Sequence, residues 1–144
     1  MMKTTFFATP DDAETAFYQA FESRNIDAMM SVWSQAEYIE CIHPMGDHLQ
    51  GVDAIRAGWE SLFSASPEVR FHILDQRYIS EGEFSFHVVS ENLRISEEEE
   101  QPSQILATNV YEKTEQGWKM ILHHASPASD KMLMQITPAP PLLH

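Results

Sequence analysis

Residues 40–46, Glu-Cys-Ile-His-Pro-Met-Gly, place a histidine directly before a proline at the end of a short, apolar-leaning stretch. Proline has no backbone N–H to donate to a sheet, so Pro44 ends the predicted strand and makes His43 its last side chain. An imidazole with an ordinary pKa of about 6.5 can accept or donate a proton near neutral pH. Three roles are therefore open for His43: a surface residue at a turn, a metal ligand, or a base at the mouth of a pocket.

The sequence gives little support to metal binding or to a covalent nucleophile. His43, Asp47 and His48 are close together, but no His-x-x-x-His helical pair and no Cys/His pattern of recognised zinc spacing occurs. The single Cys41 is expected to alternate away from the neighbours of His43, and neither a Gly-x-Ser-x-Gly elbow nor a glycine-rich phosphate loop is present. We therefore expect no metal and no cofactor.

The N-terminal half of the chain carries the helix signals that must position these groups. Thr9-Pro10-Asp11-Asp12 combines an N-cap residue, a proline at the first helical position and acids in the first turn, and apolar residues then recur at helical spacing up to Phe21. Residues 28–33 and 52–63 are two further amphipathic segments. The short strand predicted at 38–42 lies between them.

The C-terminal half is rich in β-branched and aromatic residues. Four strands are predicted, at 69–79, 83–95, 103–113 and 117–126. Turns at Gly82 and Gly117 and an acidic loop that contains Glu97–Glu100 join them as consecutive hairpins. Helices followed by an antiparallel meander predict an α+β fold, in which the helices pack on one face of the sheet.

Strand alternation alone does not decide which side chains face the helices, because both faces of the predicted sheet are partly apolar. A sheet that is apolar on both faces usually covers helices with one face and a partner subunit with the other. We therefore expect a homodimer that forms through the outer face of the sheet.

Composition limits the class of protein and its partners. The 144 residues include 9 basic and 22 acidic side chains and carry a formal net charge of −13 at pH 7. We expect one domain over 1–144, with a core at 10–130 and a C-terminal tail at 131–144. Such a negative surface repels phosphate backbones and anionic lipid, so nucleic acid and membrane are not expected partners. The single cysteine, the short apolar N-terminal stretch and the lack of a long apolar run predict a cytoplasmic protein.

Several short motifs together resemble the nuclear transport factor 2-like superfamily, and within it the SnoaL-like and ketosteroid isomerase-like branch. The motifs are Phe17-Tyr18, Asn25-Ile26-Asp27, Trp33, Cys41-Ile42-His43-Pro44, Gly51 before a helix with Trp59, Asn109-Val110-Tyr111, and Gly117-Trp118 followed by His123-His124-Ala125-Ser126. The resemblance covers roughly residues 10–130. It implies a cone-shaped roll, a curved antiparallel sheet wrapped around N-terminal helices with an internal apolar cavity, and usually a dimer.

The resemblance also implies roles for three residues. Ketosteroid isomerases keep an acidic base before a proline at the end of the first strand, and His43 occupies that place here. Asn109 matches the strand aspartate of their oxyanion pocket, and Tyr18 matches the tyrosine of the first helix, although Phe17 could take that place instead. An asparagine donates hydrogen bonds at every pH, so it could still stabilise an oxyanion.

The same resemblance implies a substrate-binding wall and leaves His87 and His123 facing outward. The expected wall consists of Trp33, Trp59, Phe84, Phe86, Val88, Tyr111, Leu122, His124 and Ser126.

Two functions are consistent with these expectations, and both place a small apolar molecule in the cavity. The first is an isomerase- or lyase-type enzyme that acts on a carbonyl-containing substrate, in which His43 moves a proton while Asn109 and Tyr18 stabilise the enolate. The alternative is a non-catalytic metabolite-binding or association domain.

Overall fold

The computed structural model describes residues 5–44, 46–65, 68–95 and 103–128. The predicted acidic loop at 97–100 and the predicted tail at 131–144 lie outside these residues. The helices and strands, in chain order, are α1 (Pro10–Ser23), α2 (Ile26–Val32), β1 (Glu40–Ile42), β2 (His48–Gln50), α3 (Val52–Ala65), β3 (Arg70–Glu81), β4 (Phe84–Arg94), β5 (Ser103–Thr114) and β6 (Gly117–Ala128). The predicted helices and strands are confirmed, and the three-residue β2 is an additional strand that the sequence did not predict.

Side-chain caps start the first two helices. The Thr9 hydroxyl oxygen accepts a hydrogen bond from the backbone N–H of Asp12 at 3.1 Å, as the sequence predicts. Asn25 caps α2 in the same way, with its side-chain oxygen 3.0 Å from the N–H of Ala28. Arg24 lies between the two helices in the left-handed conformation, at φ 54°, which ends α1 and turns the chain into α2.

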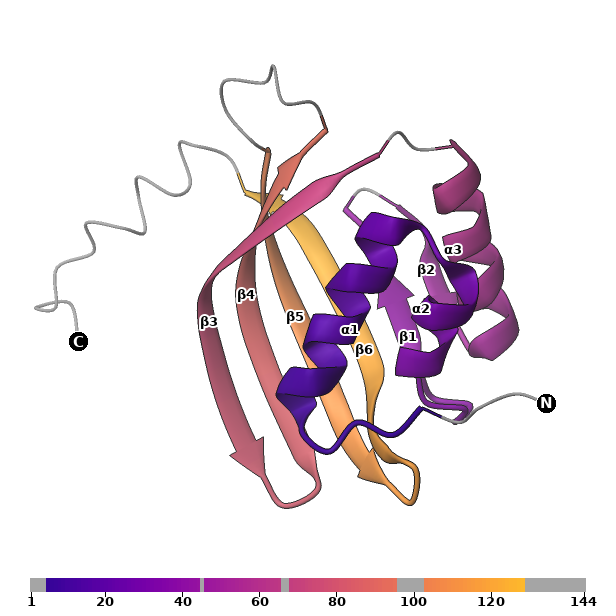
Figure 1. Ribbon diagram of the computed structural model, residues 1–144, viewed down its shortest axis with the longest axis vertical. Coiled ribbons are helices and arrows are strands. Elements are labelled where there is room, and N and C mark those ends of the chain that lie inside the picture. Colours follow the sequence, from indigo (N-terminus) through magenta and orange to yellow (C-terminus); the bar gives the residue numbers. More distant parts are fainter. Residues whose placement is uncertain (1–4, 45, 66–67, 96–102, 129–144) are drawn as a thin grey trace, which may run out of the picture.

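The strands form one sheet in the order β2-β1-β6-β5-β4-β3. The pair β1–β6 is parallel and the other neighbouring pairs are antiparallel, which confirms the α+β class. Figure 1 shows the long strands β3 to β6 curving around α1, with α2 and α3 beside it near the short strands. The helices therefore cover the concave face, and the convex face carries no other described element.

Aromatic side chains from α1 and α3 fill the space between the helices and the sheet. The Phe17 ring has no exposed surface and lies 4.9 Å from the Tyr18 ring and 5.6 Å from the Trp59 ring. Both contacts are edge-to-face, the arrangement that aromatic quadrupoles favour. Truncation of a core aromatic of this kind to alanine costs about 3–5 kcal/mol, so these rings fix the position of α1 against the sheet.

A β-bulge in β6 reverses the alternation of its side chains. Val110 pairs with Leu122 while Tyr111 pairs with Met120, so Ile121 is the extra residue. Met120 and His123 consequently both face inward, although three positions separate them. The expectation that Leu122, His124 and Ser126 line the cavity, with His123 facing outward, is therefore wrong.

The expected inner face of β4 is wrong for a related reason. His87 pairs directly with Asn109, and residues that are opposite each other in a sheet point to the same side. Asn109 and His87 are both fully buried, so Ser85, Val89 and Glu91 share this inner face. Phe84, Phe86 and Val88 instead lie on the outer face, where each exposes 40–44% of its surface.

Candidate functional site

A pocket of about 300 Å³ lies between the C-terminal end of α1, α3 and the concave face of the sheet. This size lies at the lower end of the usual range for small-molecule sites. We call it the cone pocket. It is lined by Phe21, Arg24, His43, Pro44, Leu62, Phe63, Val69, Phe71, Glu91, Leu93, Ile95, Ile105, His123 and Ala125. Most of these side chains are apolar, so its few polar groups decide what chemistry the pocket can do.

Glu91 is the acidic side chain of this pocket. Only 2% of its surface is exposed, and burial raises its pKa from 4.5 to about 7, with a further upward contribution from the negative charge of Glu14. Its Oε2 accepts a hydrogen bond from the Tyr18 hydroxyl at 2.5 Å, which partly offsets the rise. Near neutral pH the carboxyl is therefore divided between its protonated and ionised forms, as a general acid or base requires.

His43 lies on the pocket wall, as the sequence predicts. Its ring meets the Trp59 ring edge-on at 4.6 Å, and burial lowers its pKa to about 4. The imidazole is consequently neutral at pH 7 and can accept a proton. Cys41, two residues earlier on the same strand, points to the same side, with its sulfur 3.6 Å from His43 Nε2. The expectation that Cys41 turns away is wrong, but burial raises the pKa of its thiol to about 12, which leaves it a poor nucleophile.

His123 is the second imidazole on the wall, and its ring centroid lies 5.9 Å from that of His43. Burial holds its pKa well below 6.5, with smaller contributions in the same direction from His43 and His124. Its Nδ1 lies 2.6 Å from Oδ1 of Asn109. The cone pocket thus contains two neutral imidazoles and one carboxyl that titrates near neutrality.

Tyr18 and Asn109 lie behind the pocket wall and connect its two sides. The Asn109 amide donates to the Tyr18 oxygen at 3.1 Å, and the Tyr18 hydroxyl in turn donates to Glu91. Hydrogen bonds therefore run from His123 through Asn109 and Tyr18 to Glu91, and both end groups line the same pocket. The structure brings the predicted Tyr18 and Asn109 together, but neither of them lines the pocket.

Glu14, on α1, is the centre of a polar cluster deeper in the cone. Its Oε2 lies 2.9 Å from His87 Nδ1, 3.1 Å from the Tyr111 hydroxyl and 3.3 Å from the Asn109 amide nitrogen. Its Oε1 accepts further hydrogen bonds from Gln76 and Tyr78. These donors satisfy a carboxylate that is only 3% exposed.

Other members of the expected substrate-binding wall lie elsewhere. Tyr111 is buried in the Glu14 cluster, and Trp59 lies behind His43 without lining the pocket. Trp33 lines a different hollow. Of the residues that sequence reasoning placed in the site, His43 alone is on the wall of the cone pocket, and the polar lining residues it missed are Arg24, Glu91 and His123.

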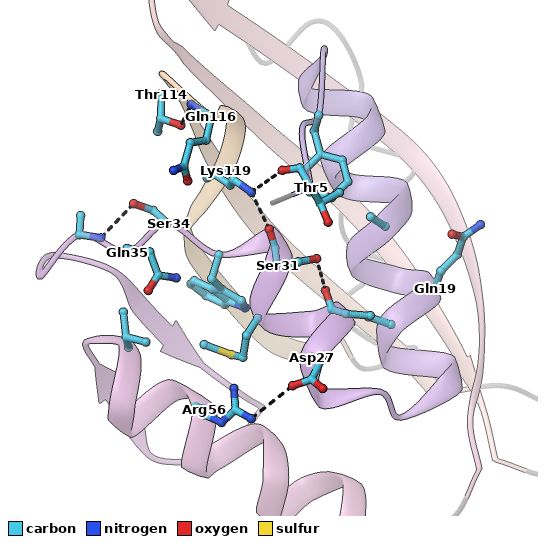
Figure 2. A pocket seen from close by; sticks show the side chains of 18 of the residues that line it. Thr5, Gln19, Asp27, Ser31, Ser34, Gln35, Arg56, Thr114, Gln116 and Lys119 are labelled. Atoms are coloured by element: carbon cyan, nitrogen blue, oxygen red, sulfur yellow. Dashed lines mark hydrogen bonds and ion pairs between the residues drawn. The ribbon is translucent and has the colours of Figure 1, made fainter. Parts of the chain in front are cut away.

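The other hollow is larger, about 1150 Å³, and more open, and shares no lining residue with the cone pocket. Figure 2 shows its polar side chains, which come from the N-terminal segment, α1, α2 and the loop after it, α3, and the hairpin formed by β5 and β6. The Lys119 ammonium, which is buried here, donates to the backbone oxygens of Thr5 and Ser31 at 2.9 and 2.8 Å. These contacts tie the N-terminal segment to α2, so a structural role accounts for this lysine.

Two negative findings hold for the part of the chain that the structure describes. No group of three His, Cys, Asp or Glu side chains is arranged to hold a metal ion. No helix in those residues is both long enough and apolar enough to cross a membrane.

A curved sheet that holds helices on its concave face, with a pocket between them, defines the cone-shaped nuclear transport factor 2-like class. The SnoaL-like domain family matches residues 11–130, and the chain belongs to this family.

Two solved structures resemble this chain over most of its length. One, from Thiobacillus denitrificans, is named as a candidate calcium/calmodulin-dependent protein kinase type II association domain. It is 43% identical, with a TM-score of 0.82, and the match covers 86% of this chain and 98% of that one. The other, from Streptomyces avermitilis, is named as a candidate dehydratase of the NTF2-like family. It is 26% identical, with a TM-score of 0.73, and the match covers 84% and 99%.

The F-box protein SKIP8 of Arabidopsis thaliana is a relative by sequence. It is 24% identical over 112 residues, which are 78% of this chain and 46% of that protein. The chain therefore spans less than half of the length of this relative.

Proposed function

We propose that the cone pocket binds a small, largely apolar carbonyl compound and catalyses proton transfer on it. The observation that carries the proposal is the presence of three groups on one apolar wall: the Glu91 carboxyl, whose pKa is raised to about 7, and the neutral rings of His43 and His123. Perturbed titratable groups that converge in a pocket are typical of acid–base sites.

The chemistry follows from the protonation states. A neutral imidazole, His43 or His123, accepts a proton from the carbon next to the substrate carbonyl. The electrons of that C–H bond form the enolate double bond, and the protonated fraction of Glu91 donates a hydrogen bond to the developing enolate oxygen. When the substrate is β,γ-unsaturated, the enolate is a dienolate, and the imidazolium returns its proton to the γ carbon, which completes an isomerisation. Alternatively, it protonates a departing β-hydroxyl, which leaves as water and completes a dehydration.

The Streptomyces relative supports the lyase form of this chemistry through its name as a candidate dehydratase. Tyr18 and Asn109 act here as positioning residues, because each touches a pocket group without lining the pocket itself. This differs from the oxyanion-binding roles that the resemblance to ketosteroid isomerases implied for them.

A thermal-shift screen of apolar ketones, lactones and β-hydroxy acids at pH 7 is the first test, because a ligand that binds the folded state raises its stability. Compounds that bind are then assayed for turnover with the wild type and with Glu91→Gln, His43→Gln and His123→Gln. Glu22→Gln is the matched control, since Glu22 lies on α1 and accepts a hydrogen bond from the backbone of Phe71. We expect at least a hundredfold loss in Glu91→Gln and in one histidine variant, in line with the usual contribution of acid–base groups. Equal turnover in all variants would contradict the proposal.

An association function is the second candidate, and it is compatible with the first. The outer face of the sheet exposes Ile79, Phe84, Phe86 and Val88, and Ile79, Phe86 and Val110 are neighbours in register across three strands. The Thiobacillus relative is named as a candidate association domain. We propose that this face pairs two copies of the chain.

Sedimentation equilibrium of the wild type, Phe86→Glu and Phe6→Glu tests the association. Phe6 is the control, because it is 65% exposed and precedes the sheet in the N-terminal segment. We expect a dimer for the wild type and Phe6→Glu and a monomer for Phe86→Glu. A monomeric wild type at micromolar concentration would rule out this interface. The expected cytoplasmic location stays a prediction.

A further inference from the structure

The partners of the Asn109 side chain determine which of its amide atoms donates a hydrogen bond and which accepts one. One atom of its amide faces Glu14 Oε2 at 3.3 Å and the other faces His123 Nδ1 at 2.6 Å. A carboxylate accepts hydrogen bonds and donates none, so the Asn109 atom that faces Glu14 must be the NH₂ group. The carbonyl oxygen of Asn109 is therefore the atom that His123 meets.

The orientation of the Asn109 amide in turn determines which ring nitrogen of His123 holds the proton. A carbonyl oxygen only accepts, so Nδ1 of His123 must be the nitrogen that holds the proton. In a neutral ring the remaining nitrogen, Nε2, then has a bare lone pair. Among the described residues Nε2 has no hydrogen-bond partner, and His123 lines the cone pocket.

We propose that Glu14, acting through Asn109, locks His123 in the Nδ1–H tautomer and so makes the cone pocket selective for ligands that present an O–H or N–H donor to His123. This inference rests on the proposed function, in that the cone pocket is taken as the ligand site. Glu14 is a positioning residue in this arrangement, since it lies outside the pocket lining and acts through a second side chain. A β-hydroxy carbonyl compound can bind both polar groups of the pocket, because its hydroxyl donates to His123 and its carbonyl accepts from protonated Glu91.

The tautomer can be read directly from ¹⁵N-histidine NMR spectra at about pH 8, where neutral rings show one pyrrole-type and one pyridine-type nitrogen. His123→Gln assigns the signals, and the exposed His72 and His124 serve as internal references. We expect a pyrrole-type Nδ1 and a pyridine-type Nε2 for His123. A proton on Nε2, an even mixture of the two tautomers, or an imidazolium would overturn the proposal.

The lock itself is tested by exchanging the amide and the carboxylate. Glu14→Gln replaces a carboxylate that only accepts by an amide that can present either its oxygen or its NH₂ group to Asn109, while the Tyr18 oxygen remains as the other acceptor, so the His123 signals should move from the pure Nδ1–H form towards a mixture of the two tautomers. The double variant Glu14→Gln/Asn109→Asp places the carboxylate at position 109, where it accepts from His123 in either orientation, and should restore the Nδ1–H form. Glu22→Gln, on the same helix, should leave the tautomer unchanged. If the tautomer is identical in Glu14→Gln and the wild type, Glu14 does not set it.

Ligand selectivity is tested with 2-naphthol and its methyl ether, which differ in the single O–H donor. One hydrogen bond of ordinary strength should make 2-naphthol bind the wild type about three- to tenfold more tightly, and Glu14→Gln should reduce this preference. Equal affinities in the wild type would overturn the selectivity. If neither compound binds, the selectivity is overturned, whereas the proposed function is decided by the carbonyl compounds of the thermal-shift screen and the NMR spectra still decide whether Glu14 sets the tautomer.

Discussion

Replacement of Glu91 by glutamine should abolish one component of the pH dependence of stability. The pKa of this carboxyl is about 7 in the folded state and 4.5 in the unfolded chain. Because the folded pKa is the higher one, the folded state favours the protonated form. The stabilisation is complete below pH 4.5, and it is lost progressively as the pH rises through 7.

The interval between the two pKa values sets the size of the effect. At about 1.4 kcal/mol per pH unit, this interval gives about 3.4 kcal/mol over the whole range, of which about 2.5 kcal/mol falls between pH 5 and pH 8. Burial justifies this conversion, since Glu91 is only 2% exposed. The glutamine variant keeps an oxygen that can accept from Tyr18 and carries no charge at any pH.

The assay is urea denaturation of the wild type and Glu91→Gln at half-unit steps from pH 4.5 to pH 8.5. Subtraction of the two curves removes the contributions of the other titrating groups, including the pocket histidines. The free energy of unfolding of the variant should rise relative to that of the wild type as the pH increases. Parallel curves for the two proteins would refute the reasoning, because they would mean that Glu91 ionises in the folded state as it does in water.

Further predictions concern the histidines and a close backbone contact. The pKa of His43 is about 4 in the folded state, below its usual 6.5, so His43 contributes stability above pH 6.5 that is lost as the pH falls towards 4. In urea titrations the free energy of unfolding of His43→Gln should therefore fall less steeply than that of the wild type as the pH drops from 6.5 to 4. An equal fall in the two proteins would contradict a buried, neutral His43 ring. Gly117→Ala should destabilise the fold by about 3 kcal/mol, because a Cβ there would lie 2.7 Å from the Phe7 carbonyl oxygen at a φ of +93°. Gly82→Ala, at φ +60° with open space around it, should cost only about 1 kcal/mol, and equal losses in thermal denaturation would argue against the close contact.

The helices and strands could be predicted because local chemistry determines them. The Thr9 cap, the helical spacing behind it and the strand end at Pro44 are signals within a few residues of one another. The position of His43 at the end of its strand follows from the same kind of local signal, since the proline next to it ends the strand.

The sequence could not predict which side chains of each strand face the helices, because this depends on pairing between distant segments. One extra residue, Ile121, brings His123 into the pocket and turns His124 outward, and no local pattern marks the bulge. The register that places His87 opposite Asn109 likewise sets the inner face of β4, and with it Glu91. An acidic side chain in the middle of a predicted strand was a signal that could have drawn attention to Glu91, but only pairing shows which way it points.

The most direct test of the central claim is chemical-shift mapping with the first compound that stabilises the protein in the screen. The account predicts that the side-chain signals of Glu91, His43 and His123 shift on binding, while those of Lys119 and Gln116, which line the other hollow, do not. Shifts confined to Lys119 and Gln116, or to the outer sheet face around Phe86, would contradict it.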